Sequence, residues 1–426
     1  MKRVITWRPP LWLVVVLMGA TLALGTGAGY VQGAANTGTC TESAEICAKF
    51  SNFWTVWNIA EERFLDPEAI EPDQMIAGAI NGMLDTLNDQ GHTRYNTAEQ
   101  FQREQESQRG NYQGIGAYVN EEGGVPVIVA PIEGSPAEAA GVQAGDVILR
   151  IDGESTEGLT IDDVVRRIRG EPGSQVTIEV RHLGEEASVE LTITRAAINV
   201  PAVTWRMLPG NVAHIRLSQF SEKAKPEMQR ALADAKAQGA TKLILDLRNN
   251  PGGLLEQAIG VTSQFLPEGK TVLRVRDRDG TEEVYNANEA NPETELPMVV
   301  LINTGSASSS EIFAGALQDH DRATIIGLQT IGLGTVISPV QLDDGSAVYI
   351  GIAEWLTPDG RELRHQGVAP DIKVALPNGV RPLTPSTAKD LTEDEILQTE
   401  DTQLRRALSV LGINTVAEGP AAIAVR

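Results

Sequence analysis

Three patterns of hydrophobic and polar positions follow one another along the chain. From Phe50 to about Glu106, apolar residues recur at helical spacing in two stripes, the first of them rich in aromatic residues. From Gly110, short runs of β-branched residues alternate with glycine and proline turns. After Ala197, strand-like and helix-like segments alternate. The pattern therefore predicts a helical region, a β-rich module and an α/β domain, in that order.

Periodicity also places the elements inside these regions. One helix, about Ile161–Arg169, interrupts the β-rich module, and a final helix, about Glu393–Leu411, follows a Pro/Thr-containing linker after Pro377. His92 and Arg94 fall between periodic segments, and we expect them in a polar surface loop. We expect strands at Val125–Val129, Val147–Ile151, Val176–Val180, Val189–Thr194, Val212–Leu217, Lys242–Leu247, Met298–Ile302 and Ala323–Gly327, and helices at Pro226–Gln238 and Glu311–Asp319.

The length of 426 residues predicts more than one domain, because single cores stop growing at ~250–300 residues. The β-α-β alternation after residue 197 favours a largely parallel sheet, so we expect a multidomain α/β protein. Its expected parts are a signal peptide or membrane anchor (1–35), a helical region (36–107), the β-rich module (108–196), the α/β domain (197–375), and a C-terminal linker and helix (376–426).

Charge and residue types exclude some classes of partner. The formal net charge is −22, and so acidic a surface repels phosphate backbones, so we do not expect nucleic-acid binding. No Cys/His cluster has the spacing of metal ligands. We therefore expect neither a metal ion nor a cofactor.

The N-terminus has the pattern of an export signal. Three basic residues among the first eight precede an apolar run from Leu11 to about Val31. The run is long for a signal peptide and just long enough to span a bilayer, so a cleaved signal and an uncleaved anchor both stay open. Either way, the rest of the chain is expected outside the cytoplasm, secreted or held at the membrane. Export would permit a disulfide between Cys40 and Cys47, although two free or intermolecularly paired thiols are the alternative.

Residues 112–117, Tyr-Gln-Gly-Ile-Gly-Ala, can form a carboxylate-binding turn. Gly114 and Gly116 flank Ile115, and glycines at such positions allow several backbone N–H groups to face one point. An extended peptide could then add as a strand beside Ala117–Val119. The alternative is an ordinary glycine turn in a β module.

Two further motifs follow in the β-rich module, Gly134-Ser-Pro-Ala137 and Ala144-Gly-Asp-Val-Ile-Leu-Arg-Ile-Asp-Gly153. With them, the whole module resembles a PDZ domain, of the circularly rearranged type found in exported bacterial proteases. The resemblance implies that Gly114, Ile115 and Gly116 form the carboxylate loop and that the helix at 161–169 forms a wall of the peptide groove.

Two strand ends of the α/β domain carry residues suited to acyl transfer. The strand Lys242–Leu247 leads into Arg248-Asn-Asn-Pro-Gly-Gly253, and paired glycines can present the free N–H groups of an oxyanion hole. The strand Met298–Ile302 leads into Gly305-Ser-Ala-Ser-Ser-Ser-Glu311, where serines enter a helix N-terminus. Taken alone, the serine run is better explained by ordinary helix capping.

Taken together, the motifs resemble the C-terminal processing peptidase family, the tail-specific serine peptidases of the S41 type. The resemblance covers most of the chain after the N-terminal segment. It implies an α/β core of the S41/ClpP-crotonase-like type, a serine nucleophile with a lysine general base, and cleavage of proteins near their C-termini. The motifs are Asp246–Leu254, Gly305–Asp319, Asp344–Ser346, Leu356–Arg361 and Gly367–Asp371.

The resemblance also implies roles for single residues. The family's nucleophile lies eleven residues before the aspartate of a Leu-Gln-Asp motif, so Asp319, a supporting residue, places the nucleophile at Ser308. The other serines of the run then belong to the helix entry. The oxyanion hole would consist of the N–H group of Ser309 and that of Gly252 or Gly253.

The chain departs from the family pattern at the general base. Leu333 stands at the position of the lysine, and Ile337 stands at that of a glutamine four residues later. Leucine cannot take the proton that makes a serine nucleophilic. Another base could serve, and the candidates are His365, His214 and Lys242. Otherwise the chain is a non-catalytic relative that binds peptide, or Leu333 is an engineered change; the second apolar replacement favours a natural variant.

The sequence thus predicts an exported serine-type peptidase that captures unfolded or extended polypeptides with free C-termini. The alternative is a peptide-binding scaffold that has the peptidase fold without its activity. A homo-oligomer is compatible with the sequence, and the N-terminal segment is the expected contact with a membrane.

Overall fold

The computed structural model describes residues 42–89, 92–122, 124–132, 135–143, 145–182 and 184–414. It divides into two compact units, Met1–Ile76 and Ala77–Arg426. The predicted export signal and Cys40 lie outside the described residues, so export and the pairing of Cys40 with Cys47 stay predictions. None of the described helices is long and apolar enough to cross a membrane.

The described part of the first unit, residues 42–76, is helical, as the apolar stripes predict. Helix α2 (Ala44–Arg63) begins at Ser43, whose side chain accepts a hydrogen bond from the Ile46 N–H group. Asp66 and Pro67 end this helical stretch with a short 3-10 turn, η1 (Pro67–Ala69), before helix α3 (Pro72–Asp85). The aromatic side chains of α2 contact one another along the helix.

The predicted helical pattern is interrupted by a short strand, β1 (Arg94–Asn96), before helix α4 (Ala98–Gln108). Strand β1 is too short to leave a periodic signal, and it is held by antiparallel pairing with β18 (Ala347–Leu356). His92, expected in a surface loop, is instead buried, with 8% of its surface exposed.

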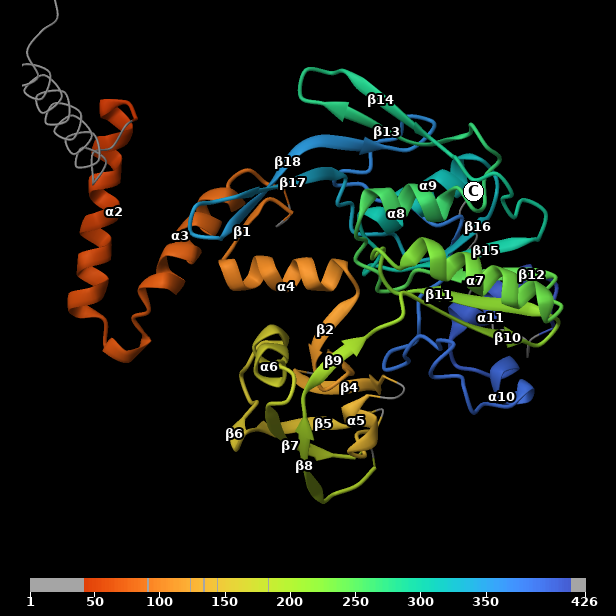
Figure 1. Cartoon of the computed structure of the whole chain (residues 1–426), viewed down its shortest axis with the longest axis horizontal. Coiled ribbons are helices and arrows are strands. Elements are labelled where there is room, and N and C mark those ends of the chain that lie inside the picture. Colours follow the sequence, from red (N-terminus) through yellow and green to blue (C-terminus); the bar gives the residue numbers. More distant parts are fainter. Residues whose placement is uncertain are drawn as a thin grey trace, which may run out of the picture. The chain divides into compact units, whose positions relative to one another are not determined.

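The β-rich module forms a sheet in the order β3-β4-β5-β7-β8, with β6 paired to β5. Its core is aliphatic and includes Ile128, Ile148, Val164 and Ile178. Strands β2 and β9 pair with each other at the point where the chain enters and leaves the module (Figure 1). The elements are β2 (Asn111–Gly114), β3 (Ala117–Glu122), β4 (Val125–Pro131), α5 (Pro136–Ala139), β5 (Val147–Ile151), β6 (Glu154–Ser155), α6 (Ile161–Ile168), β7 (Gln175–Arg181), β8 (Ser188–Thr194) and β9 (Ala196–Asn199).

The α/β domain is built on a six-stranded sheet in the order β10-β11-β12-β15-β16-β19. Strands from β11 onward are parallel to their neighbours, as predicted, and β10 is antiparallel to β11. The elements are β10 (Val203–Leu208), β11 (Val212–Leu217), α7 (Ala224–Ala237), β12 (Lys242–Asp246), α8 (Leu255–Thr262), β15 (Met298–Ile302), α9 (Ser309–Asp319), β16 (Thr324–Gly327) and β19 (Ile372–Lys373).

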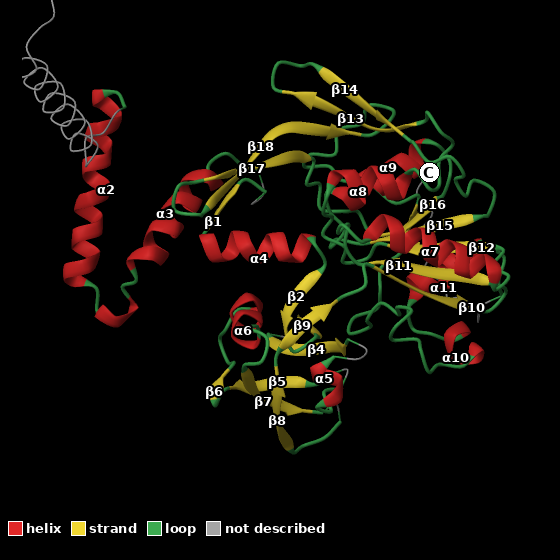
Figure 2. Cartoon of the chain, in the orientation of Figure 1, coloured by secondary structure: helices red, strands yellow, loops and turns green. Residues whose placement is uncertain are grey.

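Both faces of this sheet are covered, as is usual for parallel sheets (Figure 2). Side chains of α7, α8 and α9 share one apolar core with β11, β12 and β15. The opposite face packs on α10 (Glu393–Leu397) and α11 (Thr402–Val410). A single final helix was expected, but Asp401 interrupts it by capping α11 at its N-terminus.

A second sheet, which the sequence analysis did not predict, lies beside this domain. Strands β1, β18, β13 (Thr271–Asp277) and β14 (Glu282–Asn286) follow in that order, and β17 (Thr335–Gln341) also pairs with β18. Charged residues such as Arg274 and Arg276 interrupt the apolar pattern of β13. Antiparallel pairing across the sheet stabilises these strands instead.

Candidate active site

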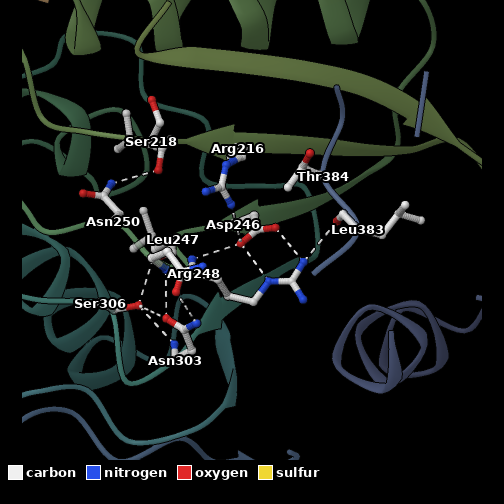
Figure 3. A network of polar contacts seen from close by, with 12 residues as sticks. Arg216, Ser218, Asp246, Leu247, Arg248, Asn250, Asn303, Ser306, Leu383 and Thr384 are labelled. Atoms are coloured by element: carbon white, nitrogen blue, oxygen red, sulfur yellow. Dashed lines mark hydrogen bonds and ion pairs between the residues drawn. The ribbon is translucent and has the colours of Figure 1, made fainter. Parts of the chain in front are cut away.

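Two loops meet where parallel strands β12 and β15 end, as the sequence predicts. Asp246 lies opposite Leu301 in the strand register, so the segments after both strands emerge side by side. The Asn249 N–H group donates to Asn303 Oδ1 at 2.8 Å, and Asn303 Nδ2 donates to Asn249 Oδ1 at 2.7 Å. These bonds hold the paired-glycine segment against the serine segment, around the residues drawn in Figure 3.

The serine hydroxyl groups separate into two kinds. Ser306, Ser309 and Ser310 are buried, and each hydroxyl donates to a backbone carbonyl group of the β12 end. Ser308 is only half-buried, and its hydroxyl donates to no group in the described part of the chain. The geometry therefore singles out Ser308 as the available nucleophile. The acceptors are Leu247 O for Ser306 (2.8 Å), Gly253 O for Ser309 (2.9 Å) and Asn250 O for Ser310 (2.9 Å).

The backbone of Ser308 adopts an unusual conformation, with φ +52° and ψ −115°. Positive φ is costly for a residue with a Cβ atom, and such strain is concentrated at functional sites. The turn places Ser308 directly before α9, where the first N–H groups of a helix and its positive dipole end favour negative charge.

Two backbone N–H groups near Ser308 are free to stabilise an oxyanion. The Gly252 N–H group is not available to an oxyanion, because it donates to Asn250 Oδ1 at 2.9 Å. The N–H groups of Gly253 and Ser309 have no acceptor among the described residues. The Ser309 hydroxyl donates to Gly253 O, which holds the two residues together. Of the two glycines that the sequence proposed, the geometry favours Gly253 as the donor.

Glu311 is a buried carboxylate that connects the nucleophile to the segment after β16. Its Oε2 atom accepts hydrogen bonds from Ser308 N at 2.8 Å and Leu333 N at 3.0 Å. Its Oε1 atom accepts from Thr330 Oγ1 and Gly332 N, each at 2.6 Å. Burial raises the pKa of Glu311, although these hydrogen bonds act in the opposite direction. Sequence reasoning had treated this residue only as part of the helix entry.

Leu333 lies beside the nucleophile, at the position that the resemblance gives to a lysine. Its N–H group and that of Ser308 share one carboxylate oxygen of Glu311, and its apolar side chain is half-buried. Ile337 lies farther along β17 and packs against a cluster that includes Phe101 and Tyr349. Neither side chain can take up a proton.

The three alternative bases named from the sequence are placed elsewhere or occupied. His214 is buried on β11, and its Nε2 atom lies 3.2 Å from Asp246 Oδ2. Lys242 begins β12, at the opposite end of the strand from the glycine segment. His365 has an exposed side chain, and its backbone N–H group donates to Gly332 O.

A further histidine, His92, which the sequence placed in a surface loop, lies close to the segment after Leu333. Its Nδ1 atom lies 2.5 Å from Thr335 Oγ1, and Thr335 follows Leu333 by two residues. Thr335 Oγ1 in turn donates to Asp89 Oδ2 at 3.4 Å. The tautomer in which Nδ1 carries the proton and donates to Thr335 Oγ1 leaves a lone pair on Nε2. Nε2 has no hydrogen-bond partner in the described chain.

Burial lowers the pKa of His92 below its usual value, although the nearby Asp89 acts against this shift. A buried imidazole disfavours the extra positive charge, so the neutral form persists to lower pH. His92 is therefore held in the form that accepts a proton.

Asp319 lies at the far end of α9 from Ser308. Its carboxylate forms an ion pair with Arg361 and accepts a hydrogen bond from the Asp359 N–H group at 2.9 Å. Asp319 thus fixes the turn of the Leu356–Arg361 motif and does not reach the serine.

The predicted carboxylate loop joins β2 to β3 and lines a pocket of about 300 Å³. Gly116 has φ +79°, and the Ile115 side chain is buried in the module's core. The Ile115 and Gly116 N–H groups have no acceptor among the described residues. The pocket is also lined by Val165 and Ile168 of α6 and, from the α/β domain, by Pro251. This arrangement suits an extended peptide added beside β3.

The comparisons with known proteins agree with this architecture. Residues 211–374 match the model of peptidase family S41, and residues 127–182 match that of a PDZ domain. The carboxy-terminal processing protease CtpA of Bacillus subtilis is 38% identical over 308 residues, which are 72% of this chain and 66% of that protein. The carboxyl-terminal-processing protease of Synechocystis is 41% identical over 305 residues, which are 70% of this chain and 71% of that protein.

A solved structure, the photosystem II D1 C-terminal processing protease, is 30% identical with a TM-score of 0.50. The match covers 76% of this chain and 93% of that one. The fold and site define a serine peptidase architecture with a PDZ domain. The chain belongs to peptidase family S41, among the relatives named C-terminal processing proteases.

Proposed function

We propose that this chain is an exported serine-type peptidase that cleaves extended polypeptides near their C-termini. The PDZ domain captures the free chain end, and Ser308 attacks the peptide bond. The observation that carries the proposal is the state of Ser308: its hydroxyl is the one uncommitted member of the serine run within the described chain, and it lies beside two free N–H groups.

The proposed chemistry is acyl transfer. Ser308 Oγ gives its proton to the general base and forms a bond to the scissile carbonyl carbon, while the carbonyl electron pair moves to oxygen and is stabilised by the Gly253 and Ser309 N–H groups. The carbon–nitrogen bond then breaks, and the amine leaves with a proton from the general base. Water then attacks the acyl carbon and gives a proton to the base, and the bond to Ser308 Oγ breaks as Oγ takes that proton.

His92 is the proposed general base in place of the absent lysine. The Leu333 N–H group shares a carboxylate oxygen with the Ser308 N–H group, and His92 contacts Thr335 two residues farther on. No hydrogen bond joins His92 to Ser308 among the described residues, so this role requires a bridging water or a movement of the imidazole when substrate binds. Asp89 and Thr335 orient the imidazole.

The second candidate is a peptide-binding scaffold without peptidase activity. Leu333 favours it, because an apolar side chain occupies the lysine position beside the nucleophile. Under this alternative, the PDZ pocket alone would carry the function.

Cleavage of an unstructured protein by the full chain, compared with Ser308→Ala, separates the two. The matched control is Ser306→Ala, which removes a buried hydroxyl of the same run. Fragments lost only in Ser308→Ala support the peptidase. If the wild type makes no fragments but retains affinity for peptides with free C-termini, the scaffold is correct.

Export rests on the N-terminal sequence. Basic residues followed by the apolar run Leu11–Val31 support a signal or anchor. Fractionation of cells expressing the full chain tests this: protease-accessible protein outside the cytoplasm is expected, and protein confined to the cytoplasm would refute it.

A further inference from the structure

A buried arginine links the C-terminal segment to the glycine turn of the candidate site. Arg248 follows β12, and its side chain is fully buried. Its guanidinium group makes a two-pronged contact with Asp246, with Nε 3.0 Å from Oδ1 and Nη2 2.7 Å from Oδ2. Figure 3 shows this guanidinium group between Asp246 and Leu383.

The other contacts of Arg248 come from residues more than 130 positions later. Nη1 donates to Asp401 Oδ2 at 2.7 Å and to Gln403 Oε1 at 3.2 Å, and Nη2 donates to Leu383 O at 3.1 Å. An arginine has five N–H donors, and all five are used. Leu383, Asp401 and Gln403 lie after the range that matches the S41 family.

The charges of this network depend on one another. Burial would raise the pKa of Asp246, but Arg248 and the hydrogen bond from His214 hold it well below its usual range. Asp246 also lies 3.7 Å from Arg216, so two arginines share its single negative charge. The buried guanidinium of Arg248 therefore needs a second acidic partner. Asp401 supplies the second negative charge, and it is only 1% exposed.

Arg248 opens the segment that ends at Gly253, one of the two proposed oxyanion donors. Asn250, two residues on, is buried and donates from Nδ2 to Leu217 O at 2.8 Å. Asn250 Oδ1 accepts the Gly252 N–H group, and Asn250 O accepts the Ala307 N–H group at 3.1 Å. The turn is therefore held by Arg248 at its start and by Asn250 in its middle, and Gly253 follows directly.

We propose that Asp401 is a positioning residue for the candidate active site, acting through Arg248 on the turn that ends at Gly253. The segment after the family core thereby becomes part of the catalytic apparatus without touching substrate. The proposal rests on the proposed function for its effect on cleavage, but its effect on the turn can be measured independently.

Asp401→Asn in the full chain isolates the role of the charge. Asp401 also caps α11 by accepting the Leu404 N–H group at 2.9 Å, and asparagine is an equally good N-cap, so the helix start is retained. Glu400→Gln removes an exposed charge one residue away and serves as the matched control. Leu408→Ala loosens α11 in its apolar core without touching Arg248.

Two readouts are compared: amide hydrogen exchange of residues 249–254, and kcat and KM for an unstructured substrate. In Asp401→Asn, exchange of the turn is expected to rise at least fivefold, and kcat to fall at least tenfold with KM within twofold. Glu400→Gln is expected to match the wild type, and Leu408→Ala to speed exchange in α11 only.

The proposal is overturned if Asp401→Asn leaves turn exchange at the wild-type rate, or if Leu408→Ala loosens the turn equally. A wild type that cleaves nothing contradicts the proposed function instead. The exchange measurement then still decides the role of Asp401.

Discussion

Gly252→Ala tests whether the close approach of the glycine turn to the nucleophile is essential. A Cβ atom on Gly252 would lie 2.8 Å from Ala307 O and 2.9 Å from both Ser308 Cβ and Ser309 N. Because real Cβ atoms do not approach other atoms so closely, the turn and the nucleophile segment must separate. The backbone of Gly252 is also left-handed, with φ +100°, which costs a residue with a Cβ atom ~1–2 kcal/mol.

The steric cost of the added Cβ atom and the cost of the left-handed backbone can be separated by comparing Gly252→Ala with Gly239→Ala. Gly239 has a similar φ of +91° but open space where its Cβ atom would lie, so it carries the backbone cost alone. Overpacking adds ~1–3 kcal/mol at Gly252. A loss of ~1 kcal/mol lowers the melting temperature of a domain this size by ~2–4 °C.

The two variants, Gly252→Ala and Gly239→Ala, should differ far more in their rate of cleavage than in their melting temperature. Displacing one oxyanion donor costs ~10²–10³ in kcat. The assay is kcat for an unstructured protein substrate, measured below the melting temperature of each variant. If Gly252→Ala cleaves within threefold of Gly239→Ala, the glycine turn does not form the oxyanion hole.

Three further predictions concern the base and the PDZ domain. Since burial lowers the pKa of His92, the acid limb of the kcat/KM profile should lie below pH 6.5, and His92→Gln should cost ~10²–10⁴ in rate; a wild-type rate in that variant would exclude this base. Gly116→Ala would place Cβ 2.4 Å from Ser135 Cβ, so affinity for a labelled peptide with a free C-terminus should fall at least tenfold, and unchanged affinity would exclude the loop. The hydrogen bond to Asp146 raises the pKa of His182, so its stabilisation is complete below pH 6.5 and is lost as pH rises through the folded-state pKa. The melting-temperature difference between wild type and His182→Gln should therefore shrink from pH 6 to pH 8, and a constant difference would refute this.

The sequence predicts most reliably what is local. Strands β12 and β15 are built on continuous apolar runs, β11 is largely apolar apart from His214 and Arg216, and each forms where predicted. The motif predicts Ser308 as the nucleophile, and the structure adds that the hydroxyls of the neighbouring serines donate to backbone carbonyl groups.

What the sequence did not reveal depends on distant partners. His92 is buried through Thr335, 243 residues away, and nothing in its own neighbourhood marks it as different from a surface residue. Asp401 interrupts an otherwise helical pattern because its carboxylate caps α11 and binds Arg248, 153 residues earlier. The family resemblance drew attention to the lysine position, but Leu333 at that position does not indicate whether another residue serves as the general base.

The most direct test of the central claim is covalent labelling of the full chain with a fluorophosphonate, mapped by peptide mass spectrometry. If Ser308 is an activated nucleophile, one adduct should form, on Ser308, and His92→Gln should slow its formation. An adduct on Ser306, Ser309 or Ser310 would contradict the assignment of the nucleophile. No adduct at all, in a chain that still binds peptide, would contradict the peptidase itself.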